Sequence, residues 1–247
     1  MQDAMPAFFV TGTDTGVGKT LVTAAILAAA KRRGLRVSAL KPAETGCQTD
    51  PLGELAPSDA RFLATALGFP ANESVPCVYR FELPAAPAVA ARHAGQTISF
   101  AEISRVFRRE RARHPDLLLV EGAGGLLVPF TERETAADLA MLLELPLVVV
   151  ARPGLGTINH CALTIECARH RGLDVAGFLF SHAQRETTKD PTIRTNAAEI
   201  ARLTGAPFLG TLGHQVERSA DALAHAAERD LDIDALFADR YRDAPSS

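Results

Sequence analysis

Residues 9–20 read Phe-Val-Thr-Gly-Thr-Asp-Thr-Gly-Val-Gly-Lys-Thr, and this stretch decides the fold. An apolar run at 8–10 leads into the glycines, and a helical pattern over 20–33 follows them. A glycine-rich turn between a strand and a helix lets backbone N–H groups and the helix N-terminus surround a phosphate. The stretch therefore predicts a phosphate-binding loop, with Lys19 on the β and γ phosphates of ATP and Thr20 on Mg²⁺.

The spacing of the glycines departs from the common phosphate-loop pattern. Five residues separate Gly12 from Gly18, where that pattern has four, and Thr13 occupies the usual place of the first glycine. A glycine-rich turn with a solvated lysine is the plainer alternative. The phosphate-binding interpretation is favoured because strand, loop, Gly-Lys-Thr and helix occur together. We expect the nucleotide to contact Gly16, Val17, Gly18, Lys19, Thr20 and Leu21.

Outward from the loop, short apolar runs alternate with helical patterns. The predicted strands are 8–10, 37–40, 117–120, 147–150, 175–180 and 208–212. The predicted helices are 20–33, 134–143, 158–170 and 192–203, with two more starting at Ser58 and lying around Ile103. This alternation predicts an α/β fold of the P-loop NTPase type, with a doubly wound, mostly parallel sheet. We expect a single domain over 1–247, flexible ends at 1–6 and 240–247, and the least regular structure at 70–97.

Composition narrows the class of protein. The chain has 247 residues, of which 47% are hydrophobic, and its net charge of -3 argues against nucleic acid or an anionic membrane as the main partner. Its apolar runs are far shorter than the ~20 residues that a membrane helix needs, and its N-terminus lacks the basic region of a signal peptide. None of the four cysteines lies in a C-x-x-C pair, so we expect reduced thiols and a cytoplasmic location.

Two carboxylates are candidate magnesium ligands. Glu121 directly follows the apolar run 117–120, and the ends of such strands line the ligand crevice. Asp59 stands at the start of a predicted helix, where capping is the commoner role for an aspartate. Since Mg²⁺ prefers hard oxygen ligands, Thr20, Asp59 and Glu121 form the candidate set. The small residues after Glu121 leave room for a nucleotide, and we expect contacts from Gly122, Ala123 and Gly124.

Lys41 ends the second predicted strand and precedes Pro42. A lysine at the end of a strand is usually just solvated. Near a transferred phosphoryl group it would instead neutralise the charge that grows in the transition state. Both interpretations are open on the residues alone.

Taken together, the motifs resemble those of the dethiobiotin synthetase family. The family's opening motif is similar to residues 9–20, including the longer glycine spacing. Further motifs follow in the family's order, namely Lys41-Pro42 with Thr45-Gly46, Ser58-Asp59-Ala60, 120–125 and 154–160. The resemblance runs from about residue 7 to 214.

The resemblance implies an ATP-dependent ligase of biotin synthesis, which converts 7,8-diaminononanoate, CO₂ and ATP into dethiobiotin, ADP and phosphate. CO₂ would first form a carbamate on one substrate amine. The carbamate would attack the γ-phosphate to give a carbamic–phosphoric anhydride, which the second amine would attack to close the ring. Lys19 and Lys41 would be catalytic, holding phosphate and carbamate oxygens, while Thr20, Asp59 and Glu121 would hold Mg²⁺.

The family also implies a homodimer with the substrate tail near the subunit interface. Thr45 would contact the diamine side of the substrate. Leu155, Asn159 and the N–H groups that open their helix would receive the substrate carboxylate from the partner subunit, and a helix N-terminus suits such an anion. Read without the family, Asn159 is a cap or first-turn residue.

Contacts to the nucleotide base are expected at the ends of the last two predicted strands, at Ser181, His182, Leu212, Gly213 and His214. Family members commonly carry Asn where this chain has Ser181-His182, and often Pro in place of Gly213. These departures leave the preference among nucleotides open.

Other nucleotide-binding classes are alternatives. A partitioning or positioning ATPase of the same fold branch carries a signature lysine five residues before the main one, where this chain has Asp14. A regulatory GTPase needs an Asn-Lys-x-Asp motif, which the chain lacks. A cobyrinate-type amidating ligase needs an added glutaminase domain, for which 247 residues leave little room. A nucleotide-binding protein without chemistry is the plainest alternative.

Overall fold

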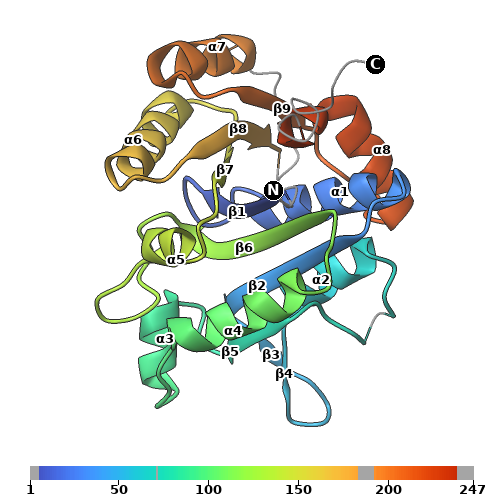
Figure 1. Ribbon diagram of the computed structural model, residues 1–247, viewed down its shortest axis with the longest axis vertical. Coiled ribbons are helices and arrows are strands. Elements are labelled where there is room, and N and C mark those ends of the chain that lie inside the picture. The colour runs from blue at the N-terminus through green and yellow to red at the C-terminus, as the bar shows by residue number, and fades with distance from the viewer. Residues whose placement is uncertain (1–5, 71, 183–191, 238–247) are drawn as a thin grey trace.

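The computed structural model describes residues 6–70, 72–182 and 192–237. Its centre is a seven-stranded parallel sheet in the order β5-β2-β6-β1-β7-β8-β9, which runs from bottom to top in Figure 1. The strands are β1 Ala7–Gly12, β2 Val37–Thr45, β5 Cys77–Phe81, β6 Leu117–Gly125, β7 Leu147–Ala151, β8 Val175–Ser181 and β9 Phe208–Leu212. The predicted α/β fold with a parallel sheet is confirmed.

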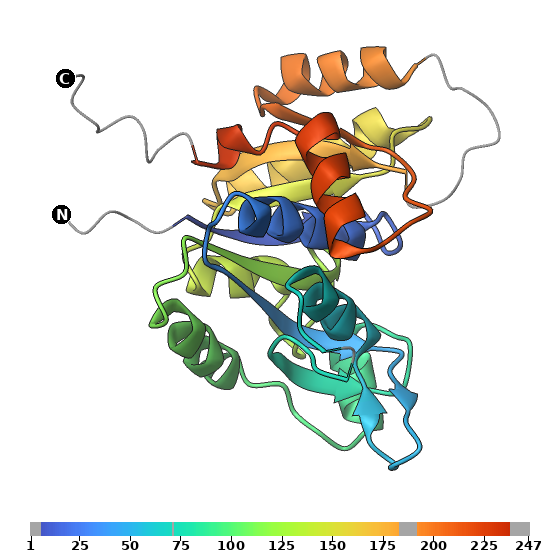
Figure 2. The same ribbon diagram turned by 90° about the vertical axis from the view of Figure 1, so that its right-hand side faces the viewer.

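Helices cover both faces of the sheet (Figures 1 and 2). One face carries α1 Lys19–Arg32, α2 Ser58–Ala66 and α8 Ala220–Asp230, which face the viewer in Figure 2. The other carries α3 Pro87–His93, α4 Phe100–Arg111, α5 Ala136–Leu142, α6 Thr157–His170 and α7 Ile193–Thr204. A short 3-10 helix, Asp234–Phe237, ends the described part.

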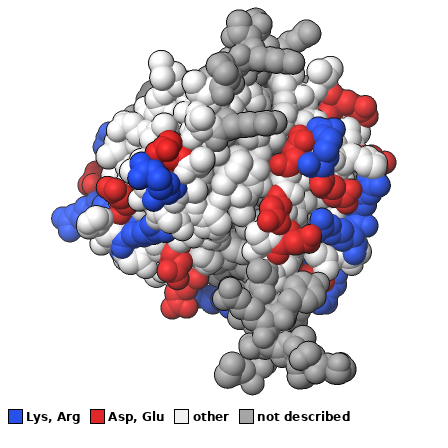
Figure 3. Space-filling view, turned by 90° about the horizontal axis from the view of Figure 1, so that it is seen from above, with Lys and Arg blue, Asp and Glu red and all other residues white. Residues whose placement is uncertain are grey.

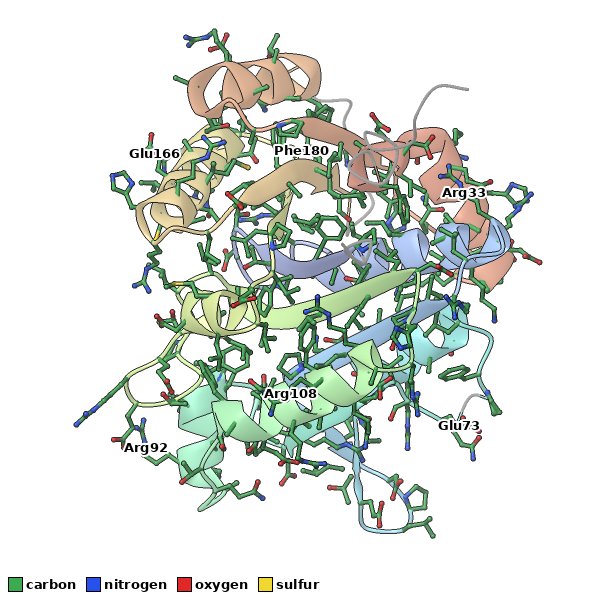
Figure 4. All side chains as sticks on the ribbon, viewed as in Figure 1. Arg33, Glu73, Arg92, Arg108, Glu166 and Phe180 are labelled. Carbon is green, nitrogen blue, oxygen red and sulfur yellow. The ribbon has the colours of Figure 1, made fainter. Side chains whose placement is uncertain are left out.

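Alternation along the central strands builds two cores. Phe8 and Val10 of β1 face the α1 side, whereas Phe9 faces the α5 and α6 side. Successive side chains of a strand point to opposite faces, so a continuously apolar strand serves both layers. Phe180 of β8 lies in the interior in Figure 4, whereas the labelled charged residues Arg33, Glu73, Arg92, Arg108 and Glu166 are all exposed.

The predicted strands and helices are all present, but β2 and β6 each extend five residues further than predicted. β2 continues from residue 40 to Thr45, and β6 continues from residue 120 to Gly125. β2 pairs with β6 over Val37–Leu40 and with β5 from Lys41 onward. Pro42 therefore lies where the strand is paired on one side only. A proline is tolerated there because the strand needs no N–H donor on its unpaired side.

Several elements were not predicted. β5 and α3 lie within 70–97, the segment expected to be least regular, and a two-stranded sheet joins β3 Gln48–Thr49 to β4 Leu55–Ala56. These elements are short, half-buried or start with proline, so their periodicity is weak. α8 lies in a tail without a motif and is stabilised by tertiary packing on α1. The expected flexible ends lie outside the described residues except for Pro6, and the extent of one domain over 1–247 stays a prediction.

The distribution of charge on the surface and the state of the four cysteines match what the sequence led us to expect. The face in Figure 3 carries Lys and Arg beside Asp and Glu, with no large area of one sign among the residues drawn in colour. All four cysteines are free, and burial raises the pKa of Cys77 to about 12 and of Cys161 to about 11. Within the described ranges, no helix combines the length and the apolar character that a membrane span requires.

Leu63 offers a test of the packing of α2. Its side chain is fully buried in the core that α2 shares with α1. Leu63→Ala should lower the free energy of unfolding by about 2–5 kcal/mol, because the lost side chain leaves a cavity. Urea unfolding followed by circular dichroism measures this change. Thr65→Ala, on the exposed side of the same helix, should change it by less than about 0.5 kcal/mol. Equal effects of the two variants would contradict the packing described.

Candidate active site

The carboxyl ends of β1, β2 and β6 meet at one edge of the sheet and position the candidate residues. β2 and β6 pair through Leu40 and Val120, and the next residues, Lys41 and Glu121, face each other. Ligands of open α/β sheets bind at this edge, in the crevice where neighbouring strands part. The residues predicted for the site at Lys19, Lys41 and Glu121 therefore lie close together at this edge of the sheet.

The phosphate loop turns directly from β1 into α1. Gly18, in the left-handed conformation with a φ of 95°, caps α1 without a side chain, so the first N–H groups of the helix are left for a ligand. A Cβ on Gly12 would lie 2.7 Å from the Asp14 carbonyl oxygen and 3.0 Å from Lys19 Nζ. Glycine is thus required at the start of the loop. The Val17 side chain is buried in the core, so only its backbone is available to a ligand in the loop.

Lys19 is held beneath the loop, where Nζ donates to the Asp14 carbonyl oxygen at 3.2 Å. Burial lowers the pKa of this lysine to about 8, against the opposing effect of the Glu121 carboxylate. Desolvation disfavours the charged form of an amine, and a nearby anion favours it. An anionic phosphate would therefore stabilise the charged lysine.

Lys41 lies between two carboxylates. Nζ is 2.6 Å from Glu121 Oε1 and 2.6 Å from Asp59 Oδ2, and only 4% of the lysine side chain is exposed. Burial alone would lower the pKa of Lys41, but Glu121 and Asp59 together raise it above its ordinary value. The alternative of a merely solvated lysine is wrong. Asp59 directs its carboxylate at this lysine, and Pro57, not Ser58, is the N-cap of α2.

Thr20, Asp59 and Glu121 offer the hard oxygen donors that Mg²⁺ prefers. Thr20 Oγ1 donates to Glu121 Oε1 at 2.8 Å, while Glu121 Oε2 is buried and has no hydrogen-bond partner among the residues that the structure describes. A buried carboxylate oxygen without a partner is costly, and a cation would offset that cost. The described residues hold no group of three or more His, Cys, Asp or Glu suited to a metal. Magnesium at a nucleotide commonly uses only one or two carboxylates with phosphate oxygens, so the donors fit.

A cavity of about 360 Å³ opens over these groups. Eleven predicted site residues line it: Gly16, Gly18, Lys19, Thr20, Leu21, Lys41, Thr45, Asp59, Gly122, Ala123 and Gly124. Residues 15–21 come from the loop and α1, and residues 122–124 from the end of β6. The two lysines, Asp59 and the N-terminus of α1 thus border one space. Glu121 is fully buried and does not line the cavity, but its carboxylate accepts hydrogen bonds from Thr20 and Lys41, which do.

Glu44 and Arg218 also line this cavity and were not predicted. Glu44 is buried near the end of β2, inside a motif in which only Lys41 and Thr45 had been assigned roles. The sequence indicates Glu44 only indirectly. Pro57 has no side-chain acceptor with which to cap α2, so the first N–H groups of this helix need an acceptor from another segment. Arg218 precedes α8 in the tail and carries no motif, so only the fold reveals it.

Leu155 and Asn159 do not line this cavity. Gly156, in the left-handed conformation, caps α6 without a side chain, and Asn159 is exposed in the first turn. Leu155 is 100% exposed. The start of α6 therefore presents the Leu155 and Asn159 side chains at the surface.

The predicted base-contact residues form a separate group at the ends of β8 and β9. The His182 N–H donates to the Leu212 carbonyl oxygen at 3.0 Å, and the Gly213 N–H to Asp230 Oδ2 at 3.2 Å. Ser181 Oγ and His214 Nδ1 are buried without a hydrogen-bond partner in the described part of the chain. Polar atoms of this kind are available to a ligand.

A second cavity, of about 530 Å³, lies between α3 and the loop after β6, and its lining includes Phe130, Arg133 and Arg92. Figure 4 labels Arg92 on α3. It is the larger of the two, but it contains none of the lysines and carboxylates named above. Chemistry rather than volume therefore places the candidate active site at the phosphate loop.

Comparison with known proteins gives consistent results. A family model described as an AAA domain matches residues 6–220. The ATP-dependent dethiobiotin synthetase of Anaeromyxobacter dehalogenans (strain 2CP-C) is 50% identical over 200 residues, covering 81% of this chain and 86% of that protein. The ATP-dependent dethiobiotin synthetase of Thermodesulfovibrio yellowstonii is 36% identical over 239 residues, covering 93% of this chain and 98% of that protein.

Among solved structures, the MinC:MinD cell division protein complex of Aquifex aeolicus is similar with a TM-score of 0.55 and 15% identity, covering 98% of both chains. At this identity the likeness shows the fold alone. The relatives of 36% and 50% identity, by contrast, carry the synthetase name.

Proposed function

This chain belongs to the family of ATP-dependent dethiobiotin synthetases, and from that premise we propose how its residues share the work. The protein is an ATP-dependent ligase of biotin synthesis. The observation that carries the proposal is the convergence of Lys19, Lys41 and Asp59 on one cavity at the phosphate loop, with the fully buried Glu121 hydrogen-bonded to Lys41. ATP is the co-substrate, and 7,8-diaminononanoate and CO₂ or bicarbonate are the other substrates.

The chain's own groups mainly position the reactants and stabilise charge. The loop N–H groups and Lys19 hold the β and γ phosphates. Lys41 leaves its carboxylate partners in part to meet the carbamate and phosphate oxygens, where negative charge grows as the carbamate oxygen attacks phosphorus. Thr45 orients the diamine, so that its second amine reaches the anhydride and expels phosphate.

Thr20, Asp59 and Glu121 hold Mg²⁺, with the unpartnered Glu121 Oε2 as supporting observation. When bound, the ion neutralises phosphate charge. Asp59 and Glu121 have a second role in the absence of nucleotide, since they keep Lys41 charged and directed at the site.

The remaining assignments rest on burial and exposure. The buried Ser181 Oγ and His214 Nδ1 hydrogen-bond the nucleotide base, with His182, Leu212 and Gly213 around it. The exposed Leu155 and Asn159 receive the substrate carboxylate from the partner subunit of a homodimer. A cytoplasmic location completes the proposal.

The test is phosphate release from ATP by the purified protein. We expect release that depends on Mg²⁺, on 7,8-diaminononanoate and on bicarbonate together, because the site positions all reactants before phosphoryl transfer. Removing the metal with EDTA should abolish it, and adding excess Mg²⁺ should restore it. Mass spectrometry should identify dethiobiotin as the product. Phosphate release at the same rate with and without the diamine would contradict the proposed function and favour a simple ATPase.

A further inference from the structure

The N-terminus of α2 lacks a cap of its own. Pro57 is the N-cap, and no side chain of the helix satisfies the first N–H groups. The first helical N–H groups need acceptors, and a negative charge there interacts favourably with the helix dipole. The acceptor must therefore come from elsewhere in the chain.

Glu44, near the carboxyl end of β2, supplies the acceptors for these N–H groups with its two carboxylate oxygens. Oε1 accepts from the Asp59 N–H at 2.8 Å and from Ser58 Oγ at 3.1 Å, and Oε2 accepts from the Ala60 N–H at 3.1 Å. The glutamate is 3% exposed, although it borders the cavity. α2 lies beside this end of β2 in Figure 2, so one side chain joins strand and helix.

One of these hydrogen bonds is made by the backbone of Asp59, whose side chain is a candidate metal ligand. Glu44 fixes the backbone of Asp59, whose Oδ2 lies 2.6 Å from Lys41 Nζ. Lys41 and Glu44 are in turn three positions apart on the same strand. A shift of α2 would therefore move Asp59 relative to Lys41 and Glu121, which stay on the sheet.

We propose that Glu44 is a positioning residue that sets Asp59 for metal binding and for its contact with Lys41, an inference that rests on the proposed function of the site. Groups that orient metal ligands typically contribute about 10- to 100-fold to metal affinity. Glu44→Ala should therefore weaken metal binding about 10- to 100-fold. Glu44→Gln should weaken it less, because one oxygen is kept while the new amide opposes the Ala60 N–H.

The experiment measures binding of Mn²⁺, as a probe of the metal site, to the full-length protein with ADP by electron paramagnetic resonance. Mg²⁺-dependent turnover is measured in parallel. Leu63→Ala is the matched control for general loss of stability in α2, since it leaves the cap in place. Asp59→Asn reports on the proposed metal ligand itself.

Weakened Mn²⁺ binding in Glu44→Ala and Asp59→Asn, with Leu63→Ala unchanged, supports the proposal. Normal binding in both Glu44 variants while Asp59→Asn is weakened would overturn it and leave the proposed function standing. Equal weakening by Leu63→Ala would also overturn it, because the effect would then be general loosening of the helix. Normal binding in Asp59→Asn would overturn both this inference and the proposed role of Asp59.

Discussion

Replacing Lys41 with alanine should abolish dethiobiotin formation, with a loss of at least ~10²–10³-fold in turnover. Lys41 is the buried cation between Glu121 and Asp59, and in the proposed reaction it meets the charge that develops during phosphoryl transfer. A preorganised charge at this point stabilises the transition state more than the bound substrates. We therefore expect kcat to fall far more than the affinity for ATP, which steady-state kinetics and a separate nucleotide-binding assay distinguish.

The variant needs a control for folding, because removing Lys41 leaves two carboxylates close together. Breaking a buried ion pair by removing one partner typically costs about 3–5 kcal/mol. Lys41→Gln, which keeps N–H donors, offers a milder variant, and circular dichroism should show both folded at the assay temperature. Lys31→Ala, on an exposed lysine of α1, should leave turnover unchanged. Normal phosphate release by a folded Lys41→Ala protein would remove this residue from the mechanism.

The sheet was predictable because its strands carry unbroken apolar runs. Leu117–Val120 is apolar at every position since both faces of β6 are covered, and such a run has few other interpretations. β5 could not be predicted in the same way. It is an edge strand whose side chains are mostly half-buried, so the constraint that produces a clear pattern is absent.

The site was predictable where local motifs carry it. Lys19 and Thr20 open α1 directly after the glycine-rich loop, so one contiguous stretch of sequence brings them to the site. Glu44 has no such motif, because its role arises from three hydrogen bonds to a helix that begins 14 residues later. Arg218 depends on the fold of the tail around α8. Contacts between distant segments are a property of tertiary structure and leave little trace in local spacing.

The proposed role of Asn159 leads to the second large expected effect, which concerns the proposed homodimer. If the partner subunit supplies Asn159, each active site combines Lys19 of one protomer with Asn159 of the other. Lys19→Ala should abolish turnover by removing the phosphate contact. Asn159→Ala should lower kcat/KM about 10- to 100-fold, since a hydrogen bond to a charged group contributes about 1.5–3 kcal/mol.

Mixing the inactive Lys19→Ala protein with the impaired Asn159→Ala protein should then restore activity. In a heterodimer one site carries both substitutions and the other carries neither, because the two sites of a symmetric dimer are related by its axis. Random exchange of equal amounts should recover about a quarter of wild-type turnover. Differently tagged protomers, purified together after mixing, establish that heterodimers have formed.

A second mixture separates shared sites from trivial recovery. Lys19 and Lys41 line the same cavity of one protomer, so a heterodimer of Lys19→Ala with Lys41→Ala has a defect in both sites. This mixture should stay inactive. Recovery in this mixture would indicate contamination with wild-type protein, or an active site whose two lysines come from different subunits. No recovery in the Lys19→Ala and Asn159→Ala mixture, with heterodimers present, would show that Asn159 does not act across the interface, and the exposed start of α6 would then need another role.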